Sequence, residues 1–384
     1  MASEAGAPRV VVASDSFKGS LTSAEVADIV REELLALVPG ARCDCVRVAD
    51  GGEGTLDAIA ATRPCERVSV RVHGPLGHTT DASYLLLDDG SAVVEMAAAS
   101  GLTLVGAREL DPMAASTRGT GELIGHALSR GARRLWVGIG GSATNDAGLG
   151  ALRELGVRFL GEKNEELSGC GRDLGRVRAI DASGLDARLA ACEVLVMCDV
   201  DNPLCGPRGA TRVFAPQKGA DARMVDELER GMRSYARVLD ASVGRAVSRQ
   251  PGSGAAGGVG SALMAFAGAR VRPGIDCVLD LAGFDDIARD ADLVVTGEGR
   301  LDAQTAAGKA VCGVCGRSAA LGVRAAAIVG MCDASEDETR DLGLVRVEAC
   351  VGPDVDPERA MAQAEPNLRA AARRLFSAEF GGAA

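Results

Sequence analysis

The sequence predicts an α/β fold with a parallel sheet, and three observations support this. Short apolar runs alternate with amphipathic helical patterns at both ends of the chain. Several of these runs are apolar throughout, as strands buried on both faces should be. The middle of the chain has a different pattern of closely spaced strands. The length of 384 residues corresponds to two domains.

The N-terminal region predicts a strand–helix–strand–helix order. Arg9–Ser14 is the first strand, and Thr22 begins a helix as an N-cap residue, with Glu25 three positions later completing a capping box. Cys43–Val48 is the next strand and Thr55–Ala61 the next helix. Strands joined through helices in this way lie parallel in one sheet.

The middle region predicts strands joined by short turns, followed by helices. The expected strands are Arg67–Val72, Ala82–Leu87, Ala92–Glu95, Arg134–Ile139 and Glu193–Cys198. The expected helices lie near Gly121–Ser129, Asp221–Leu239 and Gly257–Ala267. The close spacing of the first three strands indicates antiparallel pairs.

The strand–helix alternation returns near the C-terminus. The expected elements are strands at Leu293–Thr296, Arg324–Val329 and Val345–Ala349 and helices at Lys309–Leu321 and Pro357–Phe376. We therefore predict a discontinuous Rossmann- or flavodoxin-like parallel-sheet domain made of residues 1–72 and 290–384, with an inserted mixed α/β domain at residues 73–289. The strands Arg9–Ser14 and Leu293–Thr296 should share one sheet.

Charge and composition exclude some classes of partner. The net charge of −11 and the pI near 5.0 argue against nucleic-acid binding. No run approaches the roughly 20 apolar residues that a membrane span needs, and the N-terminus lacks a signal-peptide pattern. The twelve cysteines are spread thinly, which is typical of free thiols in a reducing compartment. We expect a cytoplasmic protein without a membrane partner.

Three apolar strands of the predicted terminal domain end in similar loops. Their sequences are Asp15-Ser16-Phe17-Lys18-Gly19, Asp50-Gly51-Gly52-Glu53-Gly54 and Gly297-Glu298-Gly299-Arg300. In open parallel sheets, ligands bind outside the carboxyl ends of the strands. Glycine lets the backbone approach an anion, and a carboxylate can hold Mg²⁺ or a hydroxyl group. Tight turns would also use Gly and Asp, but three such loops favour a binding site.

A fourth glycine-rich loop follows the strand at Arg134. It contains Gly140, Gly141, Ser142, Thr144 and Asp146, and its amides and hydroxyls suit a phosphate or carboxylate. The spacing Gly138-x-Gly140-x-x-Ala143 also fits a loose dinucleotide fingerprint. No strand with a clear acidic end follows about 20 residues later to hold a ribose, so that pattern is weak evidence.

A pair of carboxylates leaves the end of the strand at Glu193. Asp199 and Asp201 precede Asn202-Pro203. An aspartate here can accept a proton from an attacking hydroxyl, as phosphoryl transfer requires. The alternative is that Asp199 only caps a turn or helix. If the extended geometry continues, Asp201 would raise the pKa of Asp199 by like-charge repulsion.

Lysine is rare in this sequence. Only four of the 42 basic residues are Lys, and Lys18, Lys218 and Lys309 each adjoin a glycine in a loop. Lys acts on phosphate as a point charge, whereas Arg is a planar fork. Gly308-Lys309 is not a P-loop, because Ala303 and Ala310 stand where that motif needs Gly and Ser or Thr.

These motifs together resemble the bacterial glycerate kinase family, type I. The matching segments keep their order from about residue 8 to about residue 375. They are Asp15–Leu21, Ala49–Thr55, Glu95–Gly101, Gly119–Glu122, Gly140–Asp146, Cys198–Leu204, Pro216–Gly219 and Thr296–Arg300. The resemblance implies two α/β domains with the active site in the cleft between them. It also implies D-glycerate, ATP and Mg²⁺, with 2-phosphoglycerate favoured as the product.

Roles can then be given to individual residues. Asp199 and Lys18 are the candidate catalytic residues, and Glu298 and Asp50 the candidate metal ligands. The candidate substrate- or phosphate-binding residues are Asp15, Ser16, Asp50, Gly51, Gly52, Glu53, Gly140, Gly141, Ser142, Thr144, Asp146, Asn202, Lys218, Gly297, Arg300 and Lys309. The alternatives are an NAD(P)-dependent oxidoreductase using the Gly138 loop and a non-catalytic metabolite-binding protein. The sequence leaves a monomer and a homodimer equally open.

Overall fold

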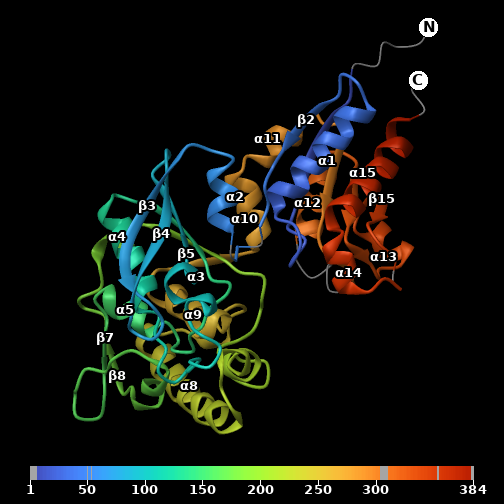
Figure 1. Ribbon diagram of the computed structural model, residues 1–384. Helices are drawn as coiled ribbons and strands as arrows, with labels where there is room; N and C mark the ends of the chain where they lie inside the picture. Colours follow the sequence, from blue (N-terminus) through green and yellow to red (C-terminus); the bar gives the residue numbers. More distant parts are fainter. Residues whose placement is uncertain (1–6, 50, 53, 303–309, 353, 382–384) are drawn as a thin grey trace. The chain divides into compact units, whose positions relative to one another are not determined.

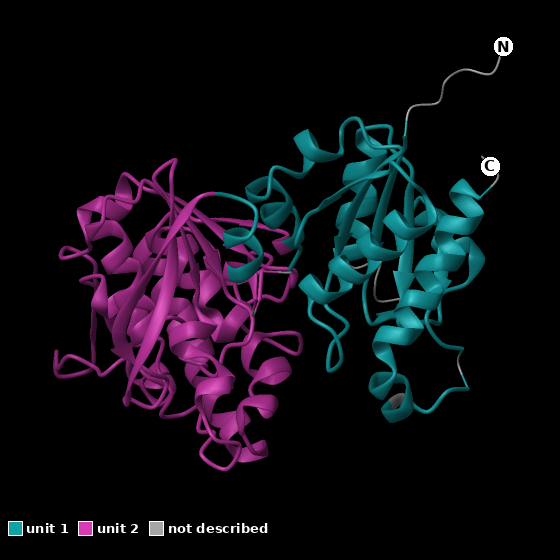
Figure 2. Cartoon of the chain, turned by 45° about the horizontal axis from the view of Figure 1, so that its top comes forward, with its two compact units in different colours: residues 1–50, 57–63, 275–384 teal, residues 51–56, 64–274 magenta. Residues whose placement is uncertain are grey.

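The chain folds into two compact units. The computed structural model describes residues 7–49, 51–52, 54–302, 310–352 and 354–381. The terminal unit comprises residues 1–50, 57–63 and 275–384, and the inserted unit comprises residues 51–56 and 64–274 (Figure 2). No described helix combines the length and the apolar character that a bilayer crossing needs.

The terminal unit contains a five-stranded parallel sheet with the order β15-β13-β11-β1-β2. Its strands are β1 (Arg9–Ser14), β2 (Arg42–Cys45), β11 (Leu293–Gly297), β13 (Ala325–Val329) and β15 (Leu344–Ala349). β1 pairs with β11 from Val10 opposite Leu293 to Ser14 opposite Gly297. The prediction that segments from both ends of the chain share one sheet is confirmed.

Helices cover both faces of this sheet (Figure 1). Val10 and Val12 of β1 pack against α1 (Ser23–Leu37) and α15 (Ala364–Phe380). Val11 and Ala13 face the opposite layer. That layer consists of α10 (Gly274–Leu281), α11 (Phe284–Ala288) and α12 (Ala310–Ala320). The run Val10–Ala13 is apolar throughout because each of its side chains meets a helix layer. The unit also contains β12 (Arg300–Leu301), β14 (Met331–Cys332), α13 (Glu336–Asp341) and α14 (Pro357–Ala362). The helix α2 (Thr55–Ala60) begins in the inserted unit and ends in the terminal unit.

The inserted unit contains a six-stranded mixed sheet with the order β10-β9-β6-β5-β4-β3. Its strands are β3 (Cys65–His73), β4 (Thr79–Leu87), β5 (Ser91–Glu95), β6 (Arg134–Gly138), β9 (Glu193–Met197) and β10 (Arg270–Arg272). β5, β6, β9 and β10 are parallel, and β3 and β4 form the antiparallel side of the sheet. The carboxyl ends of β5, β6 and β9 therefore share one edge.

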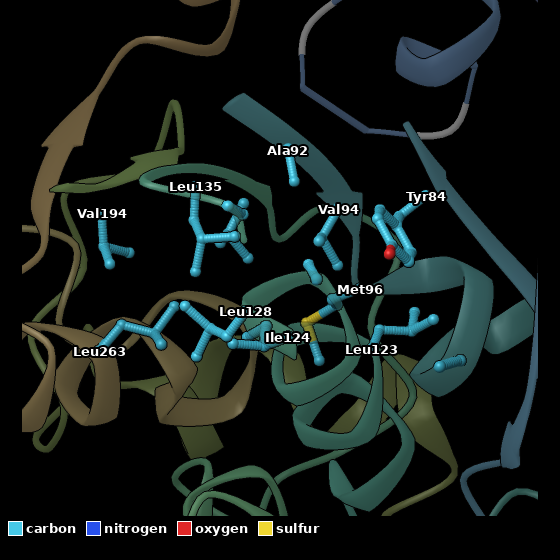
Figure 3. Close-up of a cluster of buried hydrophobic side chains, with 14 of the residues drawn as sticks. Tyr84, Ala92, Val94, Met96, Leu123, Ile124, Leu128, Leu135, Val194 and Leu263 are labelled. Atoms are coloured by element: carbon cyan, nitrogen blue, oxygen red, sulfur yellow. The ribbon is translucent and has the colours of Figure 1, made fainter. Parts of the chain in front are cut away.

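One face of this sheet packs against helices to form the first core of the inserted unit. Val94 and Leu135 point from the strands towards Leu128 and Ile124 of the helix below (Figure 3). The helices that supply this layer are α3 (Ala97–Ser100), α4 (Arg118–Ser129) and α9 (Ala255–Phe266).

A second core in the inserted unit joins helices to a small hairpin. Phe159 of β7 and Tyr235 of α8 meet there edge to face, with ring centroids 6.2 Å apart. The elements of this core are α5 (Leu149–Glu154), β7 (Arg158–Leu160), β8 (Ala179–Asp181), α7 (Ala210–Phe214) and α8 (Ala222–Val243). The short helix α6 (Ala187–Ala190) packs its Leu189 into the first core. Four 3₁₀ turns complete the unit: η1 (Leu102–Leu104), η2 (Gly171–Arg176), η3 (Pro216–Lys218) and η4 (Val247–Arg249).

The structure places the boundaries between the units differently from the sequence prediction. β3 was expected in the domain of residues 1–72, but it pairs along its whole length with β4 and belongs to the inserted unit. The second boundary, expected at residue 290, lies at residue 275, because α10 and α11 complete the helix layer over β1 and β11. Strand pairing and helix packing decide these positions, and neither is visible in local composition.

Two helices differ from their predicted form. The single C-terminal helix expected at Pro357–Phe376 is divided into α14 and α15. Pro366 lies in the first turn of α15, where its missing N–H is tolerated, but it would break a continuous helix. The helix expected from Gly257 begins with left-handed residues, since Ala256, Gly257 and Gly258 have φ values of 53°, 67° and 99°.

A buried carboxylate joins α1 to α15. Glu33 is only 4% exposed. Its Oε1 accepts a hydrogen bond from Arg369 Nη1 at 3.0 Å, and its Oε2 accepts one from Arg373 Nε at 2.6 Å. The hydrogen bond from Arg373, with the further contribution of Arg369, holds the pKa of Glu33 below its usual value. The ionised carboxylate is therefore the form that stabilises this helix pair.

We expect the variant Arg369→Met/Arg373→Met to lose about 3–5 kcal/mol of unfolding free energy at pH 7, because Glu33 is left buried and unpaired. The depressed pKa stabilises the wild type above the pKa of the unfolded state, and this contribution is lost as pH falls through the folded pKa. The difference between the two proteins should therefore shrink on acidification.

Urea unfolding at pH 7 and pH 4 measures this difference. The control Arg340→Met/Arg359→Met removes the same charge from exposed positions of the terminal unit. Equal stability of the two double variants at pH 7 would contradict the expectation.

Candidate active site

The first cluster of predicted site residues lies at the carboxyl ends of β1 and β11 in the terminal unit. The amide of Asp15 donates to the carbonyl of Gly297 at 3.0 Å, which joins the two loops directly. The amide of Ser16 donates to Asp15 Oδ1 at 2.6 Å. A Cβ atom on Gly297 would lie 2.1 Å from the carbonyl oxygen of Ile328, so only glycine fits there. Asp15, Ser16 and Gly297 are thus brought together as the loop pattern predicts.

Lys18 occupies a tight turn in the same cluster. Phe17 and Leu21 exchange backbone hydrogen bonds of 2.8 and 3.0 Å, which closes the turn around Lys18 and Gly19. Gly19 has a φ of +84°, a conformation that favours glycine. The backbone at Gly299 approaches that of Phe17 and Lys18. The Lys18 side chain is exposed, so its ammonium can reach a ligand.

Glu298 and Arg300 follow β11. Glu298 is 8% exposed, and its carbonyl accepts the amide of Gly330 at 3.0 Å. Arg300 lies on β12, where its exposed guanidinium is paired with Asp333. The sequence predicts Arg300 as a ligand-binding residue. In the structure its side chain is paired with Asp333 beside the β12–β14 pair, and its ligand contact stays a prediction.

Oxygen ligands suit Mg²⁺, which is usually held by one or two carboxylates and keeps several waters. Glu298 and Asp15 supply carboxylates in adjoining loops of the terminal unit, so the residues present fit such an ion. The described residues contain no group of three or more side chains arranged as a complete metal site. The predicted ligand Asp50 lies outside the described residues, as do the predicted binding residues Glu53 and Lys309.

The second cluster lies at the carboxyl edge of the sheet in the inserted unit. The backbone of Gly51 and Gly52 covers the ends of β6 and β9. A Cβ atom on Gly138 would lie 2.4 Å from the Gly51 carbonyl oxygen, and one on Gly140 would lie 2.8 Å from the Gly52 Cα. A Cβ atom on Gly51 would meet Met197 at 2.9 Å. Two glycine-rich motifs far apart in the sequence are therefore in direct backbone contact.

This contact explains the glycine spacing that resembles a dinucleotide fingerprint. The space in front of Gly138 and Gly140 is filled by Gly51 and Gly52, so the glycines serve the packing of the chain on itself. The helix α5 begins only at Leu149, beyond the fingerprint. A pyrophosphate site at a helix N-terminus is thus absent from this segment, all of which the structure describes.

Two backbone hydrogen bonds fix the turn Gly140–Ser142. The carbonyl of Gly141 accepts the amide of Leu102 at 2.9 Å, and the amide of Ala143 donates to the carbonyl of Ser100 at 2.9 Å. The amides of Gly140, Gly141 and Ser142 donate to no acceptor among the described residues. Gly141 is exposed and has a φ of +70°. Successive free amides of this kind form an anion-binding concavity.

Lys218, at the end of η3, is buried behind this turn. It is 1% exposed, and its Nζ donates to Ser142 Oγ at 2.7 Å and to the Thr144 carbonyl oxygen at 2.6 Å. Burial lowers the pKa of Lys218 to about 7, against the opposing effect of the nearby Asp146. The sequence singles out this lysine but gives no sign of its burial.

Asp146 is fully buried and holds together the starts of α4 and α5. Its Oδ2 accepts bonds from both the amide and the hydroxyl of Thr117 at 2.8 Å, and from the amide of Gly150 at 3.2 Å. Its Oδ1 accepts the amide of Gly148 at 3.0 Å. Burial raises the pKa of Asp146, and these four bonds oppose that rise. The arrangement gives Asp146 a structural role, and its predicted ligand contact stays a prediction.

Asp199 follows β9 and is exposed at the same edge of the sheet. Its Oδ1 accepts the amide of Gly274, the first residue of α10, at 2.8 Å. Asp201 forms an exposed ion pair with Arg208 at 2.6 Å, so its charge is compensated and like-charge repulsion of Asp199 is weakened. The side chain of Asn202 donates to the Arg208 carbonyl oxygen at 2.7 Å, which closes the loop.

Glu95 and Asn145 lie at this edge and were missed by sequence reasoning. Glu95 ends β5, is 8% exposed, and its Oε1 accepts the amide of Leu56 at 2.6 Å. This bond fixes the segment that follows Gly51 and Gly52. An acidic residue ending the apolar run Ala92–Glu95 was the available signal. Thr144 Oγ1 and Asn145 Oδ1 are buried without a hydrogen-bond partner among the described residues, and no sequence signal predicts that.

The contact between Gly138 and Gly51 leads to a test by substitution. We expect Gly138→Ala to lower the free energy of unfolding by about 1–3 kcal/mol, because the added methyl group collides with the Gly51 carbonyl. Gly125 is the matched control. It lies inside α4, where a Cβ atom meets only Leu155 at 3.8 Å. Gly125→Ala should be stabilising by about 0.5–1 kcal/mol. Chemical denaturation measures both, and a Gly138→Ala protein as stable as the wild type would refute the packing argument.

Comparisons with known proteins identify the family. The family model described as "Glycerate kinase family" matches residues 10–378. The glycerate kinase of Bacillus subtilis (strain 168) is 42% identical over 96% of this chain and 96% of its own length. The glycerate 2-kinase of Escherichia coli (strain K12) is 46% identical over 80% of this chain and 81% of its own length.

A solved structure agrees with these relatives. A crystal structure from Salmonella typhimurium LT2, described as a glycerate kinase 2, superposes with a TM-score of 0.86 at 40% identity. It covers 98% of this chain and 99% of its own. The chain is therefore an enzyme of the kinase class and belongs to the glycerate kinase family.

Proposed function

We propose that this enzyme transfers the terminal phosphoryl group of ATP to a hydroxyl group of D-glycerate. The observation that carries the proposal is the Gly140–Ser142 turn, in a chain of the glycerate kinase family. The three amides of this turn have no acceptor among the described residues and suit an oxyanion. Both substrates are anions, and glycerate has a carboxylate beside its hydroxyls. The relative from Escherichia coli that is named a glycerate 2-kinase supports 2-phosphoglycerate as the product.

Phosphoryl transfer asks the protein for alignment, charge neutralisation and an acceptor for the hydroxyl proton. Asp199 is the proposed acceptor: its carboxylate takes the proton as the glycerate oxygen bonds to phosphorus and the bond to ADP breaks. The rigid strand β9 precedes it, and the bond from the Gly274 amide fixes its orientation. The exposed ammonium of Lys18 neutralises phosphate or carboxylate charge as a point charge.

The remaining roles follow from the loops. Asp15, Ser16 and Gly297 bind ligand beside Lys18, together with Arg300. Gly51 and Gly52 support the Gly140–Ser142 turn. Glu298 and Asp50 would hold Mg²⁺, and the ion would supply charge neutralisation for the phosphates. We place the enzyme in the cytoplasm, since no disulfide joins its twelve cysteines, all of which are described, and ATP is available there.

The proposal is tested with the purified protein. ATP should be consumed only when D-glycerate is present, and excess EDTA should abolish the reaction. Phosphorus NMR of the product distinguishes a phosphate on O2 from one on O3. Full activity in EDTA would contradict the metal role, and a glycerate-dependent change in NAD(P)H absorbance without ATP consumption would support the oxidoreductase alternative.

The role of Asp199 has its own test. Asp199→Asn keeps an oxygen to accept the Gly274 amide but cannot take a proton. We expect kcat to fall about 10²–10⁴-fold with an almost unchanged melting temperature. Asp201→Asn is the matched control, since Asp201 is exposed and paired with Arg208, and its kcat should change little. A lowered melting temperature with kcat retained in Asp199→Asn would show that Asp199 serves only as a cap.

A further inference from the structure

The buried ammonium of Lys218 donates hydrogen bonds to the glycine-rich turn at Ser142 and to the backbone at Thr144. An ammonium group has three donors and no acceptor. Two of its donors bond to Ser142 Oγ and to the Thr144 carbonyl oxygen. Because Ser142 Oγ accepts from Lys218, the hydroxyl proton of Ser142 is available to a different acceptor. The side chain of Lys218 is too buried to meet solvent or a ligand in the open.

The positive charge behind the turn has no carboxylate bonded to it. Asp146 acts on Lys218 through space, and its own oxygens are occupied by Thr117, Gly148 and Gly150. Tyr235, from α8, is the other titratable group near Asp146, and burial keeps its hydroxyl protonated by raising its pKa. An isolated buried charge is costly unless it is compensated. An anion in front of Gly140–Ser142 would provide that compensation.

We propose that the amides of Gly140–Ser142 and the Ser142 hydroxyl bind a substrate oxyanion, and that Lys218 is a positioning residue that acts on this anion through Ser142. This differs from the direct ligand contact that the sequence suggests for Lys218. The oxyanion is the carboxylate of glycerate or a phosphate of ATP, which present the same chemistry to the turn. Only the identity of the anion depends on the proposed function.

The arrangement couples anion binding to protonation. In the free protein the pKa of Lys218 is about 7, so the ammonium and the neutral amine are both populated at neutral pH. A bound anion favours the ammonium and raises this pKa. Binding therefore takes up a proton near pH 7, and affinity falls as pH rises through the pKa of the free protein.

Isothermal titration of the full-length chain tests the proposal without turnover. D-Glycerate, ATP and inorganic phosphate are titrated separately into the wild type, Lys218→Met, Ser142→Ala and the double variant. We expect Lys218→Met to weaken binding of one substrate about 10- to 100-fold. The hydrogen bond that is lost is the charge-assisted one from Lys218 to Ser142, and this is the range for losing such a bond. Because Lys218 acts through Ser142, the double variant should lose little more than Ser142→Ala alone.

The matched control is Lys163→Met, which removes an exposed lysine from the loop between β7 and β8 and should bind like the wild type. Titration in two buffers of different ionisation enthalpy measures the proton uptake. The wild type should take up more protons than Lys218→Met on binding the affected substrate. If Lys218→Met does not fold, Ser142→Ala provides the same comparison. In that variant the ammonium of Lys218 keeps the Thr144 carbonyl oxygen as an acceptor.

Each outcome decides the proposal. Weakening of D-glycerate alone identifies a carboxylate, and weakening of ATP alone identifies a phosphate; either result supports the anion site. Unchanged affinity for both substrates and for inorganic phosphate overturns it, as do additive effects in the double variant. Loss of phosphate binding in Lys218→Met would support the site even if D-glycerate proved not to be the substrate.

Discussion

The backbone contact of Gly51 and Gly52 with Gly138 and Gly140 is the constraint on which the site of the inserted unit depends. Approach this close is possible only without side chains, and it fills the space in front of Gly138 and Gly140 with main chain. The start of the turn that follows is thereby held in place. Glu95 fixes the start of α2 from the neighbouring strand end, so the approaching segment is attached at both ends.

Two buried charged side chains, Glu33 and Lys218, show different roles for arginine and lysine in this chain. Glu33 lies between two arginines, whose planar forks reach it from solvent and pair with both of its oxygens. Lys218 is the opposite case, because the cation itself is buried and meets only a hydroxyl and a carbonyl. A compact ammonium fits such a space, whereas a guanidinium with five donors would leave several of them unsatisfied. The scarcity of lysine in the sequence is consistent with this division.

The sequence was sufficient to predict the α/β class, the parallel pairing of β1 with β11, and the gathering of glycine-rich loops at strand ends. Those features follow from local periodicity and from the geometry of parallel sheets. It grouped Arg67–Val72 with the antiparallel strands of the middle region, yet the predicted domain boundary was drawn after this strand, at residue 72. It could not separate Lys18, which is exposed, from Lys218, which is buried, since both adjoin glycine in similar loops. The hydrogen bonds of Asp146 to Thr117 were not predictable either, because the two residues are far apart in sequence.

The pairing of β1 with β11 also has a consequence for synthesis on the ribosome. Val10 and its partner Leu293 are separated by roughly 280 residues. At a translation rate of about 5–20 residues per second, β1 waits roughly 15–55 s for this neighbour. During this time the whole inserted unit emerges and can fold. The apolar strand β1, which lies between β11 and β2 in the finished sheet, still has one open edge, and neither of its faces is fully covered. A nascent chain of this kind depends on protection of its first strand until its last third has been made.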